Sequence, residues 1–372
     1  MGSILNYILP TPSRDTQQGP VSNYIISHFK YTLNSEILEG YRNVLVIETT
    51  GGYDSLENIF TDEFVSHVLE NDLTICACVV ADPGSEPSFK KINTFTKLNK
   101  IYDRISYIDS NVLFEVYENV STFHYFLEEA YDSKQNFYGT DNDLGYVSVR
   151  PTENQLDSYR NKKFLSFSRN NDKRHRLSLL HDYLTNDFSD SYFSFLQNID
   201  SQNNCKIYHG DDTMLTSDKY NEKIPIELDT KGIINGFRTD NTLPTHLFLD
   251  SIIHIVSETS FECNELFISE KVLKPILNYQ PFVVIGPHNY LKELKKQGYK
   301  TFNEFWDESY DEIKDPAKRY MRVRELILDL NKKSINELNL LYKNIKHICI
   351  YNNKQFHSME SNNSLRKILI KL

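Results

Sequence analysis

The stretch SETSFECNELFISEKVLKPILNYQPFVVIGP, residues 257–287, decides the fold of this chain. The apolar run just before it, residues 252–256, predicts a strand, and residues 282–285 predict another. Between them, residues 270–279 carry apolar side chains at helical spacing and predict a helix. A strand, a helix and a second strand in this order are typical of a parallel sheet covered by helices.

The start of this helix predicts an anion site. Ser269 is a good N-cap, so Glu270 and Lys271 fall in the first turn. Free N–H groups there carry a partial positive charge, and Lys271 adds a full one although it opposes the helix dipole. A bound phosphate would explain a lysine at this place. The alternative is a charged helix start on the surface.

The rest of the chain shows the same alternation of strand and helix patterns. We expect strands at 43–48, 73–80 and 163–168, and helices at 23–33, 56–69, 120–131, 173–184, 290–297 and 319–344, with Gly298 ending the helix at 290–297. This predicts an α/β protein. Residues 139–163 are polar and are interpreted as a linker. The predicted parts are a first domain at 1–155, a second at 156–345 and a tail at 346–372 that packs back on the first domain.

A second cationic segment follows the strand at 163–168. Arg169, Lys173, Arg174 and Arg176 lie within one short stretch of an acidic protein. The arginine fork matches phosphate oxygens in two positions at once, so these side chains are candidate phosphate ligands. The alternative is a solvated basic helix start.

Four short segments together resemble a known family of enzymes. FISEK at 267–271, PFVVIGP at 281–287, IVSETS at 255–260 and GYKTFNEFWDESYD at 298–311 are similar to the nucleotide-sugar-binding segment of glycosyltransferases of the α1,3-fucosyltransferase type, in its viral and bacterial branch. The resemblance covers residues 160–325. The first 150 residues match no motif of that family.

The resemblance implies a GT-B architecture, in which two Rossmann-like domains face a central cleft. It implies an inverting, metal-independent transferase whose second domain binds a nucleotide-diphosphate sugar. By similarity, Glu270 binds sugar or ribose hydroxyls, Lys271 binds the diphosphate and Glu258 is a further donor-side group. Arg176 corresponds to a family arginine that contacts the diphosphate, with Arg174 as the alternative in register. The donor sugar stays open between GDP-fucose and UDP-linked hexoses or pentoses.

Further donor and metal candidates come from the residues alone. His209 follows a predicted strand at 205–208, where a donor base or ribose would lie, and Arg169 is a second cationic candidate at a strand end. Asp141 and Asp143 follow a polar run rather than a strand, and the five cysteines form no cluster with histidines. We therefore expect no metal and no other cofactor.

A transferase of this kind needs a base for the acceptor hydroxyl, and a carboxylate at a strand end suits that role. Glu48 is the first candidate because two glycines that follow it allow a substrate to approach closely. Asp54 and Asp82 are the other candidates. The alternative for Glu48 is a carboxylate paired within its own loop.

Composition limits the partners. The net charge of −10 and the 40% hydrophobic residues indicate a folded acidic protein, and no apolar stretch is long enough to span a membrane. We expect a cytoplasmic protein whose acceptor is a glycan, a lipid-linked sugar or a protein. Two alternatives remain: a phage-type enzyme that glycosylates hydroxymethylated DNA through a basic patch, and an inactive module that binds a nucleotide sugar or a glycan. Lys90, Lys91, Lys97, Lys100 and Arg104 are the candidate patch.

Overall fold

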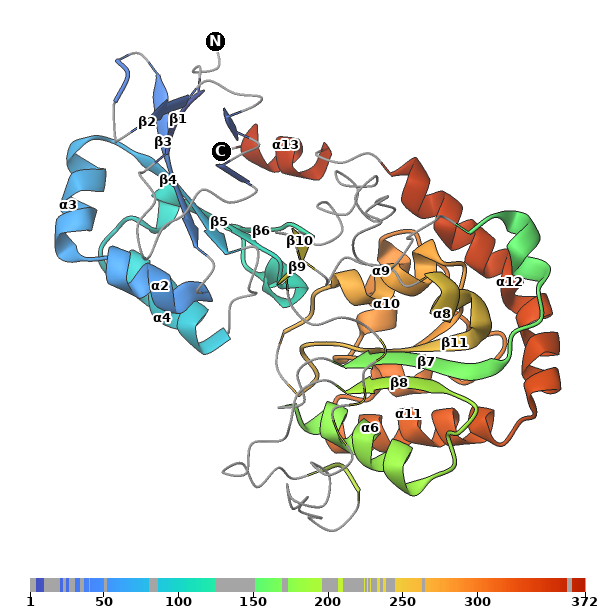
Figure 1. Cartoon of the computed structure of the whole chain (residues 1–372). Helices are drawn as coiled ribbons and strands as arrows, with labels where there is room; N and C mark the ends of the chain where they lie inside the picture. Colours follow the sequence, from blue (N-terminus) through green and yellow to red (C-terminus); the bar gives the residue numbers. More distant parts are fainter. Residues whose placement is uncertain are drawn as a thin grey trace. The chain divides into compact units, whose positions relative to one another are not determined.

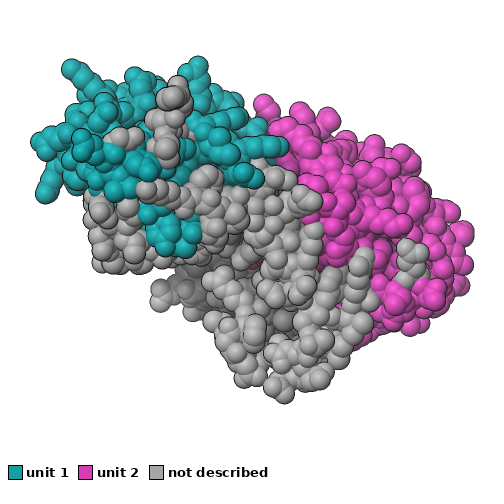
Figure 2. Space-filling view, turned by 90° about the horizontal axis from the view of Figure 1, so that it is seen from above, with its two compact units in different colours: residues 1–132, 264–267, 360–372 teal, residues 133–263, 268–359 magenta. Residues whose placement is uncertain are grey.

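The computed structural model describes residues 5–9, 21–22, 25–26, 31–33, 37–39, 41–49, 52–79, 86–124, 151–168, 173–195, 207–209, 224, 226, 228, 233–234, 237–238, 245–262, 265–359 and 363–371. The chain divides into two compact units, coloured in Figure 2. Unit 1 comprises residues 1–132, 264–267 and 360–372, and unit 2 comprises 133–263 and 268–359. Among the described residues, no helix is long and apolar enough to cross a membrane.

Unit 1 is built on a parallel sheet of six strands. Its order is β2-β1-β3-β4-β5-β6, and every neighbouring pair is parallel. Buried apolar side chains fill the central strands because helices or loops cover both faces of the sheet. The strands are β1 (Leu5–Leu9), β2 (Tyr31–Leu33), β3 (Arg42–Thr49), β4 (Thr74–Val79), β5 (Ile105–Asp109) and β6 (Val120–Thr122).

Different segments cover the two faces of this sheet. One face packs against α2 (Gly52–Ile59), α3 (Asp62–Glu70) and α4 (Glu86–Leu98). The other face packs against α13 (Asn363–Leu369), drawn in red in Figure 1, whose Leu365 and Leu369 enter the core. The end of the chain thus belongs to unit 1. Two 3₁₀ helices complete the described part of unit 1: η1 (Tyr102–Arg104) and η2 (Val112–Val116).

Unit 2 holds a second parallel sheet, of four strands in the order β12-β11-β7-β8. Figure 1 shows α6 and α11 on one face and α8 and α9 on the other. The strands are β7 (Lys162–Ser168), β8 (Tyr192–Phe195), β11 (Ser251–Ser257) and β12 (Phe282–Ile285), with a separate antiparallel pair, β9 (Ile233–Ile234) and β10 (Phe237–Arg238). The helices are α6 (Arg174–Thr185), α8 (Thr245–Asp250), α9 (Glu270–Leu277), α10 (Tyr290–Lys296), α11 (Pro316–Asn331) and α12 (Ile335–Ser358), with 3₁₀ helices η5 (Glu153–Asp157) and η7 (Ser309–Glu312).

The α/β class predicted from the sequence is confirmed by these two helix-covered parallel sheets. The strands predicted at 43–48, 73–80, 163–168, 252–256 and 282–285 are present, and none of their ends is shifted by more than one residue. The helix predicted at 120–131 is wrong at its start, where β6 pairs with β5, and the helix predicted at 23–33 is wrong at its end, where β2 pairs with β1. The helix predicted at 319–344 is two helices, α11 and α12, that meet at residues 332–334. Residues 205–208 were predicted as a strand, but the described residues 207–209 form none.

The limits of the two units differ from the predicted domain limits. Residues 151–155 group with unit 2 rather than with the first domain. Arg160, at the end of the predicted linker, is fully buried, and its guanidinium donates to the carbonyls of Phe248 and Ser251 and to the Tyr342 hydroxyl. α12 runs without a break through residue 345, because its next turns still pack on unit 2. The segment that returns to unit 1 begins at residue 360 instead of 346.

Candidate functional site

The carboxyl edge of the unit 2 sheet holds the candidate site. From β7 the chain passes through α6 to β8 on one side, whereas from β11 it passes through α9 to β12 on the other. The winding direction therefore reverses between β7 and β11. In open parallel sheets, ligands bind outside the carboxyl ends of the strands at such a reversal. The starts of α6 and α9 both border this place.

The start of α9 is organised by Ser269, as predicted. Its backbone is extended, and its buried hydroxyl oxygen accepts a hydrogen bond from the Lys271 N–H at 3.2 Å. Glu270 and Lys271 occupy the first turn. N–H groups of a first turn have no acceptor within the helix, so this turn presents donors to a ligand.

The Lys271 ammonium lies over this helix start. Its Nζ is 3.0 Å from Thr259 Oγ1, 3.1 Å from Glu270 Oε1 and 3.5 Å from Ser269 Oγ. A quarter of the side chain is exposed, so a ligand can reach it. A lysine cation and the positive end of a helix thus act at one place, which suits an anion.

The Glu270 carboxylate stays charged at neutral pH. Burial alone would raise the pKa of this carboxyl, but the nearby ammonium groups of Lys271 and Lys274 outweigh burial and hold the pKa below its ordinary value. A charged carboxylate accepts hydrogen bonds only. Glu270 can therefore accept hydrogen bonds from ligand hydroxyls while it remains paired with Lys271.

Glu258 connects three elements beneath this helix start. Its carboxylate is fully buried, and it accepts hydrogen bonds from Ser269 Oγ and from the Tyr290 hydroxyl, each at 2.6 Å. Burial and the neighbouring Glu258 raise the pKa of Tyr290 well above its ordinary value, so the phenol keeps its proton. Through these two hydrogen bonds, Glu258 holds the end of β11 against α9 and α10. Its direct contact with a donor remains a prediction.

Two side chains of α6 bind the backbone of this same residue. His175 Nε2 donates to the Glu258 carbonyl oxygen at 2.8 Å, and Arg176 Nη2 donates to it at 3.0 Å. Burial, followed by the nearby Arg176 cation, lowers the pKa of His175 to about 3, so its ring is neutral at pH 7. The ring also stacks on Phe261, with centroids 5.0 Å apart.

The two candidate arginines of α6 point to different places. Arg176 reaches the end of β11, as described above. Arg174 instead donates to the Ile207 carbonyl at 3.3 Å and lies 4.1 Å above the Tyr208 ring. Of the two alternatives in register, Arg176 is the one at the reversal point.

Ser257 adds a hydroxyl at the end of β11. The side chain is 2% exposed, and its Oγ has no hydrogen-bond partner among the described residues. A buried hydroxyl without a partner costs free energy, which a ligand group at the strand end would recover. The sequence places Ser257 at this edge, but only the structure shows that its hydroxyl lacks a partner.

His209 lies in a polar network between α6 and α11. Its Nε2 is 3.3 Å from the Asp182 carboxylate, which also accepts hydrogen bonds from the Tyr320 hydroxyl and from Arg324 Nε. The His209 ring contacts the His181 ring, with centroids 4.6 Å apart. These contacts connect parts of unit 2 with one another. The predicted role of His209 in donor binding stays a prediction.

Glu48, the first candidate base, is the last residue but one of β3 in unit 1. Its two carboxylate oxygens accept hydrogen bonds from the Val21 and Ser22 N–H groups at 3.0 and 2.9 Å, and its side chain is 2% exposed. The carboxylate is therefore paired, but with a segment 26 and 27 residues earlier in the chain rather than within its own loop. The other candidates are less well defined: Asp54 lies in α2 without a described side chain, and Asp82 and Arg169 lie outside the described residues.

The described residues contain no group of three or more His, Cys, Asp or Glu that could hold a metal ion. Asp141 and Asp143 lie outside the described part of the chain. Within the described site, the positive charge comes from Lys271, Lys274, Arg176 and the helix start.

The solved structures that are similar to this chain include two sugar-related enzymes. An α1,3-fucosyltransferase aligns with 99% of this chain and 88% of its own, at 9% identity and a TM-score of 0.45. A UDP-GlcNAc 2-epimerase from Neisseria meningitidis, bound to UDP-GlcNAc, aligns with 99% of this chain and 100% of its own, at 8% identity and a TM-score of 0.41. No family model and no curated protein sequence matches the chain. At these values, function rests on the site itself.

Proposed function

We propose that this protein is a glycosyltransferase that moves a sugar from a nucleotide-diphosphate sugar to an acceptor hydroxyl, with inversion and without a metal ion. The observation that carries the proposal is the Lys271 ammonium at the start of α9, at the reversal point of a parallel sheet. A diphosphate is the anion that such an arrangement suits best.

The donor-side roles follow from the charges of the site. Lys271 and the N–H groups of α9 bind the diphosphate, and Arg176 adds a second cation at the end of β11. Glu270 accepts hydrogen bonds from ribose or sugar hydroxyls. Ser257 offers a buried hydroxyl to the donor. Arg169 follows β7 in sequence and is assigned to the same phosphate group.

The reaction is a direct displacement at the anomeric carbon. The acceptor oxygen forms a bond to this carbon while the bond from the carbon to the diphosphate oxygen breaks, so the configuration inverts. The acceptor proton passes to a carboxylate base, for which Glu48, Asp54 and Asp82 are the candidates. The electron pair of the broken bond leaves with the nucleoside diphosphate. Lys271 and Arg176 stabilise the charge that develops there, which is the task of a metal ion in other transferases.

The acceptor is assigned to a glycan, a lipid-linked sugar or a protein rather than to DNA. Of the basic residues that would form a DNA-binding patch on unit 1, three pair with carboxylates: Lys90 with Glu86, Lys91 with Glu57 and Arg104 with Asp72. Pairs of this kind leave little net positive charge for phosphates.

A screen of nucleotide sugars by thermal shift, followed by assays of donor hydrolysis with and without EDTA, tests the proposal. A ligand that binds only the folded state at a hundred times its Kd stabilises that state by about 2.7 kcal/mol. We expect one nucleotide sugar to raise the melting temperature by several degrees, with hydrolysis unaffected by EDTA. No shift with any nucleotide sugar contradicts the proposal. Binding without turnover favours the inactive module.

Substitution of Lys271 is the sharpest test within the site. Lys271→Ala removes a charge aimed at the leaving group, so we expect kcat/KM to fall by about 100- to 1000-fold, as for the loss of other groups that stabilise transition-state charge. The matched control is Lys318→Ala, which removes an exposed lysine from the first turn of α11 in the same unit. Equal activities in the two variants would remove Lys271 from the mechanism.

A further inference from the structure

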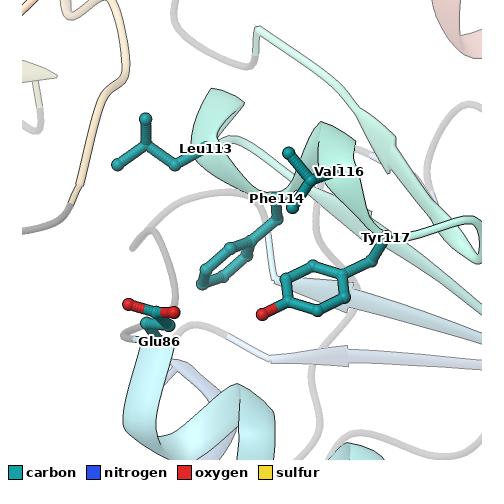
Figure 3. A pocket seen from close by; sticks show the side chains of 5 residues that line it. All are labelled: Glu86, Leu113, Phe114, Val116 and Tyr117. Carbon is teal, nitrogen blue, oxygen red and sulfur yellow. The ribbon is translucent and has the colours of Figure 1, made fainter.

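Unit 1 has a pocket at the carboxyl edge of its own sheet (Figure 3). It lies between the start of α4, which follows β4, and the segment η2, which follows β5. β4 and β5 are neighbours in the sheet, so the segments that follow them meet at its carboxyl edge. The pocket has a volume of about 200 Å³ and is lined by Glu86, Leu113, Phe114, Val116 and Tyr117.

The aromatic wall of this pocket is held firmly. Phe114 is 1% exposed and stacks on Phe89 with centroids 4.9 Å apart, and the Tyr117 ring lies 4.6 Å from the same Phe89. Asn111 caps η2, because its side-chain oxygen accepts hydrogen bonds from the Leu113 and Leu266 N–H groups. A ligand therefore meets a wall that is already in place, which lowers the entropy cost of binding.

The charged group that lines the pocket is the Glu86 carboxylate, and an ion pair balances its charge. Glu86 Oε1 pairs with Lys90 Nζ at 2.7 Å, four residues along α4. About a third of the Glu86 side chain is exposed, so a ligand can reach the carboxylate. Figure 3 shows the Tyr117 hydroxyl directed toward Glu86, with the Phe114 ring beside it. Since the ion pair is neutral as a whole, neither a phosphate nor a cation is favoured here.

The rim is apolar and open to solvent. Val116 is 80% exposed and Leu113 is 39% exposed, both on η2 beside the aromatic wall. Apolar side chains that gather at a pocket mouth commonly mark a binding site. The ligand must therefore offer an apolar face to the rings and the rim and a hydroxyl to the carboxylate.

We propose that this pocket binds one neutral pyranose ring of the acceptor. A pyranose has one face of C–H groups, which packs on aromatic rings, and an edge of hydroxyl groups, which donate to a carboxylate. The pocket is large enough for one such ring, since a cavity of about 150 Å³ already holds a benzene molecule. The identity of this sugar as the acceptor rests on the proposed function, whereas the binding of the sugar does not. The inference narrows the acceptor to a glycan or a sugar-bearing molecule.

Saturation-transfer NMR on the full chain tests this proposal. The probes are the methyl pyranosides of glucose, galactose, mannose, fucose and N-acetylglucosamine. Val116→Glu places a charge at the exposed rim without disturbing the core, and we expect it to weaken binding at least about tenfold, or 1.4 kcal/mol. The matched control is Leu98→Glu. Leu98 is 77% exposed, lies at the end of α4 and does not line the pocket, so this variant should bind the pyranoside as the unchanged protein does.

The outcomes separate this proposal from the proposed function. Saturation of at least one pyranoside that is lost in Val116→Glu and kept in Leu98→Glu supports the pocket. No saturation of any pyranoside, or equal binding by the two variants, overturns it. The nucleotide-sugar thermal shift is measured on the same samples. A pyranoside that binds while no nucleotide sugar does keeps the sugar pocket and removes the transferase.

Discussion

The carboxyl edges of the two sheets share a backbone plan but differ in chemistry. Both sheets are parallel and reverse their winding direction near the first strand of the unit. At the edge in unit 2, the Lys271 ammonium lies over the start of α9. At the edge in unit 1, Glu86 is neutralised by Lys90 beside an aromatic pocket. The fold supplies two such edges, and a few side chains at the strand ends decide that one suits an anion and the other a neutral ring.

The comparison extends to one buried glutamate in each unit. Glu258 directly follows β11 and is bound by the hydroxyls of Ser269 and Tyr290. Glu48 lies near the end of β3 and is bound by two backbone N–H groups, at residues 21 and 22. The first glutamate therefore supports a helix start that presents ligand donors, whereas the second fixes the path of a preceding segment.

The largest effect is expected for Glu258→Ala. It leaves the Ser269 and Tyr290 hydroxyls buried without their shared acceptor, so we expect the free energy of unfolding to fall by about 2–4 kcal/mol. Donor binding should weaken as well, because the start of α9 loses its support. Urea unfolding and the nucleotide-sugar thermal shift measure the two effects.

Glu258→Gln is the matched control, since it keeps the shape and one acceptor oxygen and should cost less than the alanine variant. If Glu258→Ala is as stable as the unchanged protein, the glutamate does not support the helix start, and the contrast with Glu48 fails.

The next effect is a loss of stability in acid that arises in unit 2. Burial lowers the pKa of His175 and of His254 to about 3 in the folded state, with Arg176 and Lys274 respectively as the next causes. Unfolded histidine titrates near 6.5, so below that pH the unfolded chain binds more protons and stability falls as pH decreases. Between pH 6.5 and 5 each histidine contributes a loss of about 2 kcal/mol.

Thermal unfolding as a function of pH measures this loss. His254→Phe removes one of the two groups from between Phe167 and Phe248 and should make the dependence on pH shallower. An unchanged slope in this variant would show that His254 is not the buried neutral group that the structure indicates.

The smallest of the three effects on stability is expected for Glu48→Gln. One of the two N–H groups loses its acceptor, so the free energy of unfolding should fall by about 1–2 kcal/mol. The matched control is Glu57→Gln on the surface of the same unit, where loss of the pair with Lys91 should cost less than about 0.5 kcal/mol.

Turnover distinguishes the two roles of Glu48. A base is worth about 100-fold or more in rate, so a loss of that size with an unchanged nucleotide-sugar thermal shift supports Glu48 as the base. Full activity combined with lower stability would leave the glutamate as an anchor and transfer the role of base to Asp54 or Asp82.

Local patterns in the sequence predicted local structure well. Ser269 caps α9 as predicted, and Gly298 follows α10 with a φ of 87°, the left-handed conformation expected after a helix end. Both depend on neighbours within a few residues. The helix predicted at 120–131 was wrong at its start because β6 is fixed by pairing with β5, a contact that helical periodicity does not reveal.

For the candidate site too, the sequence predicted local features but not long-range contacts. The sequence placed Lys271, Glu270 and Glu258 at strand and helix ends, but it could not distinguish Arg176 from Arg174, since both lie in the first turn of α6. The contact of Arg176 with residue 258 spans 82 positions in the chain. The pocket of unit 1 was not predicted either, because its lining comes from two segments whose adjacency depends on the pairing of β4 with β5.

By itself, the sequence determined the α/β class, most of the central strands and the charged helix start at 269–271, because these follow from side-chain periodicity, capping and charge within short segments. Only the tertiary structure decided which of these charges are partnered. It bound Glu258 to Ser269 and Tyr290, brought Arg176 to the carbonyl oxygen of Glu258 and buried Glu48 against residues 21 and 22. The physical reason is that the chemistry of a carboxylate or an ammonium group depends on its burial and on partners that the fold brings from distant parts of the chain.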